Sequence, residues 1–296
     1  MSTDKNSFFV QFPHPGGEHN PPNDAMPWNV GDHRRKFLRA PGRYLDTDGR
    51  PASAELVFWG EWEPPSRVVQ RWPKSGRLPR VLHEPYWATP QGTGFRQNTD
   101  PWIWGENMFY SCCKQVVGPE RRPTSMQSLP PGSVICFGST VDRQFCVDTV
   151  LVVASAEPFV AADAEELHAN DAFIACTAGS IASNPDDVDV KFTLYRGATI
   201  DEPINGMYSF VPARRADHET PRFPRPPINI RGLINPENRQ STWGSKRPLD
   251  LDAVRNAWIA AREQVVETGL VLAVSLDVPP RARPGGPLPA SARNRC

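Results

Sequence analysis

Proline constrains this chain more than any other residue does, because 33 of its 296 residues are proline, more than twice the usual share. Because proline fixes φ and removes a backbone donor, it limits helices and inner strands to short stretches between turns. The hydrophobic fraction of 39% and the charged fraction of 22% are nevertheless those of a globular protein. The sequence therefore predicts a packed fold of many short elements, in a chain long enough to bury a substantial core.

The charges balance, with 33 Lys and Arg residues against 33 Asp and Glu residues. This balance predicts no general attraction to nucleic acid or to a membrane, and hence weak or no duplex DNA binding. Any binding to a nucleotide or a single strand is expected to depend weakly on salt, as for contacts with about one to three phosphates. There is no apolar run of transmembrane length, and the N-terminus lacks the apolar stretch of a signal peptide, so a cytoplasmic protein without a membrane partner is expected.

Cysteines and histidines give little sign of a metal or a cofactor. The six cysteines contain no C-x-x-C, and the histidines occur singly, so free thiols in a reducing compartment and no metal site are expected. The chain has no G-x-S-x-G, no P-loop and no dinucleotide-binding glycine pattern. No cofactor is predicted.

The domain organisation is predicted from patterns of turns and apolar residues. Residues 1–53 are expected to form an extended N-terminal arm, residues 54–278 a single α+β domain, and residues 279–296 a disordered tail. The clearest β-hairpin joins strands at 133–138 and 145–154. One helix is expected from apolar residues at helical spacing that end at a glycine, namely Leu251, Val254, Trp258, Ala261 and Val265, with Gly269. The fold class predicted is α+β, with a mixed, barrel-like sheet of short strands, one or two flanking helices and long proline-rich arms.

The stretch "AELVFWGEW" mixes large apolar side chains with carboxylates over residues 54–62. Its alternation places Phe58 and Trp62 on one face of a strand, where they are expected in the core. Trp59 and Glu61 fall on the other face. A buried carboxylate needs a partner, so this pair is predicted to belong to a site that combines stacking with charge.

A second aromatic segment, "QNTDPWIWGENMFYSCCKQ", has the same mixed chemistry. Trp102 and Trp104 share a face, and Asn98 and Asp100 flank them in a turn. Indoles stack on any nucleobase, while carboxylates and amides bond to its polar edge. A carbohydrate site would use the same residue types. Four arginines are predicted to contact phosphate, or else to lie on solvated faces: Arg34, Arg35, Arg214 and Arg215.

Nucleophilic and acid–base chemistry form an alternative. Glu61 and Glu63 stand two apart on the predicted strand and would project to one face, as acid–base pairs do. Cys112 and Cys113 precede a lysine, and a thiolate beside a cation is activated; His83 is a possible neighbour in space. The opposing interpretation is a buried core thiol.

The segment "LPPGSVICFGSTVDRQFCVDTVLVVA" resembles the strand pair of PUA-like domains, the ASCH, EVE and YTH group. Together with "ELVFWGEWEP" and the second aromatic segment, the layout resembles the nucleotide-modification-associated domain families, over about residues 54 to 215. The resemblance implies a sheet fold with an aromatic pocket for a modified or flipped base, in a DNA-modification or phage-defence setting. It supplies no catalytic residues.

The leading prediction is a binding module or sensor for a nucleotide or modified nucleic-acid base. In it Trp59 stacks, Glu61 reads an amino edge, and Trp102 and Trp104 close the pocket. The alternative is an enzyme that acts on a modified nucleotide or sugar through Glu61 and Glu63 or through a Cys113 nucleophile. A third class is a structural protein whose aromatic residues form an interface. Ligand identity and oligomeric state stay open.

Overall fold

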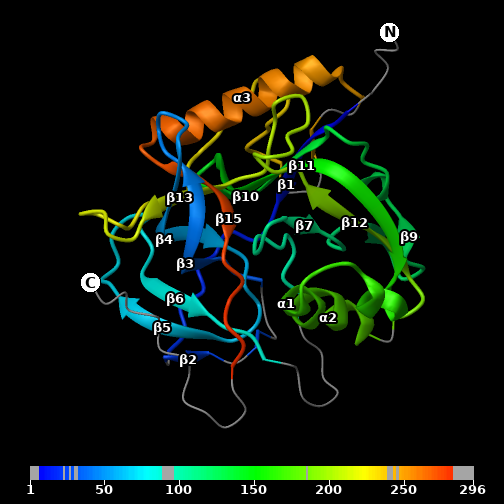
Figure 1. The fold of residues 1–296 in the computed structure, drawn as a ribbon, viewed down its shortest axis with the longest axis horizontal. Coiled ribbons are helices and arrows are strands. Elements are labelled where there is room, and N and C mark those ends of the chain that lie inside the picture. The colour runs from blue at the N-terminus through cyan, green and yellow to red at the C-terminus, as the bar shows by residue number, and fades with distance from the viewer. Residues whose placement is uncertain are drawn as a thin grey trace.

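The computed structural model describes residues 7–22, 24–26, 28–29, 33–88, 97–184, 186–238, 243–244 and 247–282. Within these ranges the chain is mostly β, with a six-stranded, a seven-stranded and a two-stranded sheet (Figure 1). The six-stranded sheet has the order β14 (Trp243–Gly244), β1 (Phe9–Pro13), β10 (Val134–Val141), β11 (Gln144–Val160), β12 (Lys191–Gly197), β7 (Phe109–Tyr110). The seven-stranded sheet has the order β15 (Val271–Leu276), β13 (Val211–Arg215), β4 (Pro51–Gly60), β3 (Lys36–Leu45), β6 (Val81–Pro85), β5 (Ser66–Arg71), β2 (Ala25–Met26). The smallest sheet pairs β8 (Val116–Val117) with β9 (Arg122–Pro123).

Four strands of the seven-stranded sheet close into a ring. β3 pairs with β4, β4 with β13, β13 with β15, and β15 returns to β3. Closure pairs the backbone groups that an open edge would leave exposed. The predicted barrel-like sheet is confirmed in this coarse form.

Helices are few in the part of the chain that the structure describes. The long one, α3 (Leu251–Glu267), is capped by Asp250, whose side chain accepts the N–H of Ala253 at 2.7 Å. It buries Val254, Trp258, Ala261 and Val265 of the apolar stripe predicted from the sequence, whereas Leu251 is half-buried. The helix runs along the top of the molecule in Figure 1. α1 (Asp171–Phe173) and α2 (Gly179–Ala182) are short and are joined by a π-helical segment, Ile174–Ala178. Two 3₁₀ turns lie at Ser125–Gln127 and Ala161–Glu166. None of the described helices is both long and apolar enough to cross a membrane.

The stretch expected to be an extended arm supplies two strands to the fold. β1 lies between β14 and β10 and pairs in parallel with β10, and Phe9 and Phe12 are fully buried. β3 pairs with β4 over ten residues. Because both strands carry apolar side chains that the sheets bury, β1 and β3 belong to the folded sheets, which corrects the expectation of an extended arm over these residues. Of the predicted tail, residues 283–296 lie outside the described residues.

The predicted hairpin is present as β10 and β11, and it contains a β-bulge. Phe137 pairs with Thr149 and Gly138 pairs with Val147, so Asp148 is the extra residue on β11. A Cβ added to Gly138 would lie 2.2 Å from the carbonyl oxygen of Cys146, so the close approach of the two strands requires glycine here. A bulge turns a side chain away from the regular alternation. This one determines where the Asp148 carboxylate points.

Candidate active site

A cavity of about 1450 Å³ opens among segments from both large sheets. The segment after β1, the residue after β4, the loop after β7, the turn of the β10–β11 hairpin and the helix α2 all line it. Ionisable side chains from three of these segments meet at its wall, namely His14, Glu61 and Cys113. Each lies within three residues of the end of a strand, so the sheets determine their positions.

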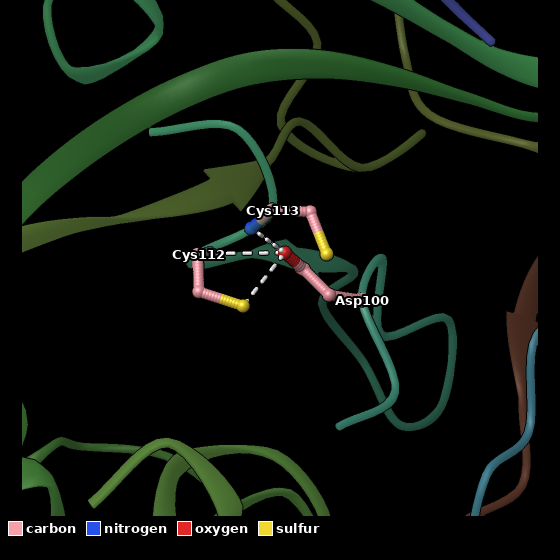
Figure 2. A group of neighbouring side chains, drawn as sticks. All are labelled: Asp100, Cys112 and Cys113. Carbon is pink, nitrogen blue, oxygen red and sulfur yellow. Dashed lines mark hydrogen bonds between the residues drawn. The ribbon is translucent and has the colours of Figure 1, made fainter. Parts of the chain in front are cut away.

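The loop after β7 is held by a buried carboxylate. Asp100 accepts the backbone N–H groups of Ser111 at 2.9 Å, Cys112 at 2.9 Å and Cys113 at 2.7 Å. Figure 2 shows this carboxylate facing both cysteines. The hydroxyl of Tyr110 donates to the carbonyl of Cys113 at 2.6 Å. With these four bonds the backbone at Cys113 is constrained on both sides.

His14 follows β1 directly and lies between two prolines. Its backbone N–H donates to the carbonyl of Gly138 at 2.7 Å, which continues the parallel pairing of β1 with β10. The imidazole packs edge-on against Phe12, with ring centroids 4.8 Å apart. The side chain of His14 makes hydrogen bonds with both Cys113 and Glu61.

Glu61 is the third member of this series and is buried beside a guanidinium. The pairing of Lys36 with Gly60 in β3 and β4 places Arg35 next to Glu61, and the Arg35 Nη1 atom donates to Glu61 Oε2 at 2.5 Å. The Nε atom of Arg35 donates to the bulge residue Asp148 at 2.9 Å. Arg35 and Asp148 thus hold the Glu61 carboxylate in place.

The charges of this group support an ion pair between Cys113 and His14. A hydrogen bond with Cys112 and another with His14 keep the pKa of Cys113 well below its usual range, against the effect of burial. Burial and Arg35 lower the pKa of His14, but Glu61 and the hydrogen bond with Cys113 raise it above its ordinary value on balance. Burial opposes ionisation of Glu61, yet Arg35 and His14 hold its pKa well below the usual range. The directions of these shifts favour a Cys113 thiolate beside a protonated His14.

The two adjacent cysteines differ. Burial, the hydrogen bond with Cys113 and the Asp100 carboxylate raise the pKa of Cys112 well above its usual range, so Cys112 keeps its proton. Burial and the charge of Cys113 raise the pKa of Asp100 to about 7. The side-chain amide of Asn98 donates to the Cys112 sulfur at 2.7 Å and lies 3.9 Å from the Cys113 sulfur. Both cysteines line the cavity, but the hydrogen bond with His14 and the directions of the pKa shifts favour Cys113 as the nucleophile.

Two groups of side chains have donor atoms close enough together for a metal ion: Asp100 with Cys112 and Cys113, and His33 with Glu61 and Glu63. The second group is already joined by ion pairs. His33 Nδ1 lies 3.2 Å from Glu63 Oε1 and 3.5 Å from Glu61 Oε1. Although burial lowers the pKa of His33, the two carboxylates raise it to about 11. A protonated His33 pairs with both carboxylates, and we assign no metal to either group.

The structure does not bring the predicted aromatic residues together at this cavity. Trp102 and Trp104 are fully buried in one core cluster, whereas Trp59 packs in the other. The indole N–H of Trp59 donates to the carbonyl of Phe223 at 2.9 Å. Because a buried indole presents no free face, Trp102 and Trp104 do not close a pocket in this structure. Phe58 and Trp62 are fully buried, as predicted.

The remaining predicted site residues divide between the cavity and other places. Asn98 lines the cavity, Asp100 supports its wall, and Arg35 is buried beside Glu61 instead of facing a phosphate. Arg34 is exposed. Arg214 donates to the carbonyls of Thr220 and Arg222, and Arg215 pairs with Asp217 at 2.5 Å. Neither Arg214 nor Arg215 lines the cavity.

The histidine predicted from the sequence as a neighbour of Cys113, His83, is the wrong one, and Asp148 is not predicted from the sequence as part of the site. His83 is fully buried and contacts Ser66 and the carbonyl of His19, and it does not line the cavity. The actual partner, His14, stands in "FPHPG" directly after an apolar strand, which was a usable local signal. Asp148 was visible as one carboxylate inside the apolar run "FCVDTVLVV".

The chain was compared with protein-family models, curated proteins and solved structures, and none of them matches it. The resemblance to PUA-like and nucleotide-modification-associated domains therefore stays a prediction, and the side-chain geometry carries the functional argument.

Proposed function

We propose that this protein is a cysteine-dependent enzyme in which the Cys113 thiolate attacks an electrophilic carbon of the substrate. The observation that carries this proposal is the hydrogen-bonded series Cys113, His14, Glu61 at the wall of the large cavity. A nucleophile, a base beside it and a carboxylate that orients the base recur in acyl-transfer enzymes on unrelated folds.

The chemistry assigned to each group is as follows. The thiolate of Cys113 adds to a carbonyl-type carbon and forms a covalent thioester. His14 gives its proton to the departing group as the bond to that group breaks. His14 then takes a proton from water, whose oxygen attacks the thioester carbon, and the thiolate leaves and is restored. Glu61 is a positioning residue that keeps the imidazole oriented.

The cavity is large enough for a nucleotide-sized ligand, since pockets for small molecules usually have volumes of about 300–1,000 Å³. A modified nucleotide or sugar, the substrate class of the enzyme alternative, is therefore compatible with its size. A binding module that stacks a base between Trp59, Trp102 and Trp104 has less support, because Trp102 and Trp104 are buried in one core cluster and Trp59 in the other.

The test is alkylation of the intact chain with iodoacetamide between pH 5 and pH 9, with each cysteine quantified by fragment mass spectrometry. We expect Cys113 to react fastest and to keep reacting below pH 7, where an ordinary thiol is protonated. The same chain is then incubated with esters, thioesters, amides and nucleotides to look for a covalent adduct, with Cys113→Ser as the control. The proposal fails if Cys113 reacts no faster than Cys112 and shows the pH dependence of an ordinary thiol.

A further inference from the structure

Two cationic side chains line the cavity of Cys113 without a protein partner. Lys114 is the next residue along the chain, and Arg143 lies at the turn of the β10–β11 hairpin. Within the described residues, neither side chain makes an ion pair or a hydrogen bond. Both are exposed to the solvent that fills the cavity.

Most other charges in the cavity wall are already neutralised. Arg121 pairs with Asp187, and the carboxylate of Asp142 accepts a bond from Arg77 at 2.5 Å. The buried ion pairs of Glu61, with Arg35 and His14, are part of the site described above. Among the described lining residues, the charges left without a partner are Lys114, Arg143 and one acid, Glu237. The charges of the wall that have no partner are therefore positive on balance.

The backbone holds both cationic residues in defined positions. Lys114 has φ of 63°, and its carbonyl accepts the hydroxyl of Thr124 at 2.7 Å. Asp142 and Arg143 have φ of 48° and 61°, as the two central residues of a type I′ hairpin turn do. Asparagine and glycine usually occupy such turns, and an arginine there costs backbone strain.

The positive charge continues beyond the hairpin turn. A smaller hollow of about 320 Å³ shares Gly16 and Asp142 with the wall of the large cavity. Four cationic residues line this hollow, against two acids: Lys74, Arg77, Arg80 and Arg225, with Glu18 and Asp142. A ligand that extends from Cys113 past Arg143 would therefore meet more positive charge.

We propose that Lys114 and Arg143 form an anion-binding subsite, and that the substrate of Cys113 carries a carboxylate or phosphate group close to its electrophilic carbon. This inference rests on the proposed function and narrows its substrate class. A cation next to the nucleophile attracts such a ligand and orients it before the thiolate attacks.

The test is a competition between two alkylating reagents that differ in charge. Iodoacetate and iodoacetamide are mixed in equal amounts with the full chain at low salt, and the ratio of the two products at Cys113 is measured by mass spectrometry. Glutathione supplies the reference ratio. Taking a separation of about 6 Å in water as the scale, a unit charge changes the local concentration of a monovalent ion roughly threefold, so we expect the iodoacetate share to exceed the reference by about threefold for each cation.

Single and double substitutions then show which cation causes the preference for iodoacetate. Lys114→Met and Arg143→Met are each expected to lower the iodoacetate share about threefold, and the double variant to bring it to the glutathione reference. High salt is expected to have the same effect on the wild-type chain. Lys191→Met is the matched control, because Lys191 is an exposed lysine that does not line the cavity.

The outcomes separate the two proposals. A Cys113 that reacts rapidly with both reagents in the glutathione ratio would overturn the anion subsite and leave the nucleophile intact. An equal loss of preference in Lys191→Met would also overturn the subsite, because the effect would then come from the general surface charge. Slow reaction of Cys113 with both reagents would count against the proposed function itself.

Discussion

The Nδ1 atom of His14 lies 3.2 Å from the Oε2 atom of Glu61, although the two residues come from different sheets. His14 extends β1 of the six-stranded sheet, and Glu61 follows β4 of the seven-stranded sheet. Arg35 contacts both side chains. The contact therefore joins the two sheets at the cavity, and disturbing it is expected to affect both stability and the chemistry of Cys113.

Replacing His14 tests whether the imidazole controls the thiol. In His14→Asn the hydrogen bond with Cys112 still lowers the pKa of Cys113 and burial still raises it, but the hydrogen bond and the positive charge of His14, which also lower it, are lost. The midpoint of the alkylation rate against pH is expected to move up, so that the rate below pH 7 falls by at most about tenfold for each pKa unit. Iodoacetamide kinetics from pH 5 to pH 9 measure this. His168→Asn, at an exposed histidine, should leave the profile unchanged. An unchanged profile in His14→Asn would show that His14 does not activate Cys113.

Replacing Glu61 tests the buried ion pairs. Glu61→Gln leaves Arg35 with one carboxylate partner, Asp148, inside the protein. Breaking a buried pair on one side typically costs about 3–5 kcal/mol of unfolding free energy. Urea denaturation at pH 7 measures the loss. Glu120→Gln, in an exposed pair with Arg122, should change the midpoint little. A loss no larger than that of the control would mean that Glu61 is not a structural anchor.

The lowered pKa of Lys36 predicts how the stability of the protein changes in alkaline solution. Burial lowers the pKa of Lys36 to about 8, whereas an unfolded lysine titrates near 10.4. Between these two values the unfolded chain holds more protons than the folded chain, so the contribution of Lys36 to stability rises with pH. The unfolding free energy of the wild type minus that of Lys36→Met is therefore expected to increase from pH 7.5 to pH 10. Urea denaturation across this range gives the difference, and Lys191→Met should show no such trend. A flat difference for Lys36→Met would contradict the shifted pKa.

Replacing Gly138 tests the β-bulge that determines where the Asp148 carboxylate points. In Gly138→Ala the new Cβ would lie 2.2 Å from the Cys146 carbonyl oxygen and 2.9 Å from the Phe145 ring, so the two strands must separate. Such overpacking costs about 1–3 kcal/mol, and displacement of Asp148 should also weaken its bond to Arg35. Thermal and urea unfolding measure the first effect, and Cys113 alkylation measures the second. Gly17→Ala is the control, because the nearest atom there is 3.8 Å away on the flexible side chain of Arg34. Full stability of Gly138→Ala would show that the bulge can relax without cost.

Local features of the fold were predictable because they depend on neighbours in sequence. The helical spacing of Val254, Trp258 and Ala261 predicts the buried face of α3, and the β-branched residues around Asp142 predict the β10–β11 hairpin. The alternation at Phe58 and Trp62 predicts their burial. In each case the side chains that decide the element lie within a few residues of one another.

The candidate site was predictable only in its chemistry. Glu61 and Cys113 stand out in the sequence because a carboxylate among indoles and a thiol beside a lysine are unusual surroundings. Which side chains they contact depends on the parallel pairing of β1 with β10, on the β3–β4 register and on the bulge at Asp148. The same dependence explains why Trp59, paired with Glu61 by sequence alternation, instead packs against Phe37 and donates its indole N–H to the carbonyl of Phe223.

By itself, then, the sequence determined residue types, element patterns and charge balance, all of which are local or additive properties. Only the tertiary structure decided that His14, and not His83, accompanies Cys113, and that Arg35 neutralises Glu61. The physical reason is that these contacts join residues far apart along the chain. Their distances are set by strand register and by the packing of two sheets. A shift of one residue in the register of a strand would turn its side chains to the opposite face.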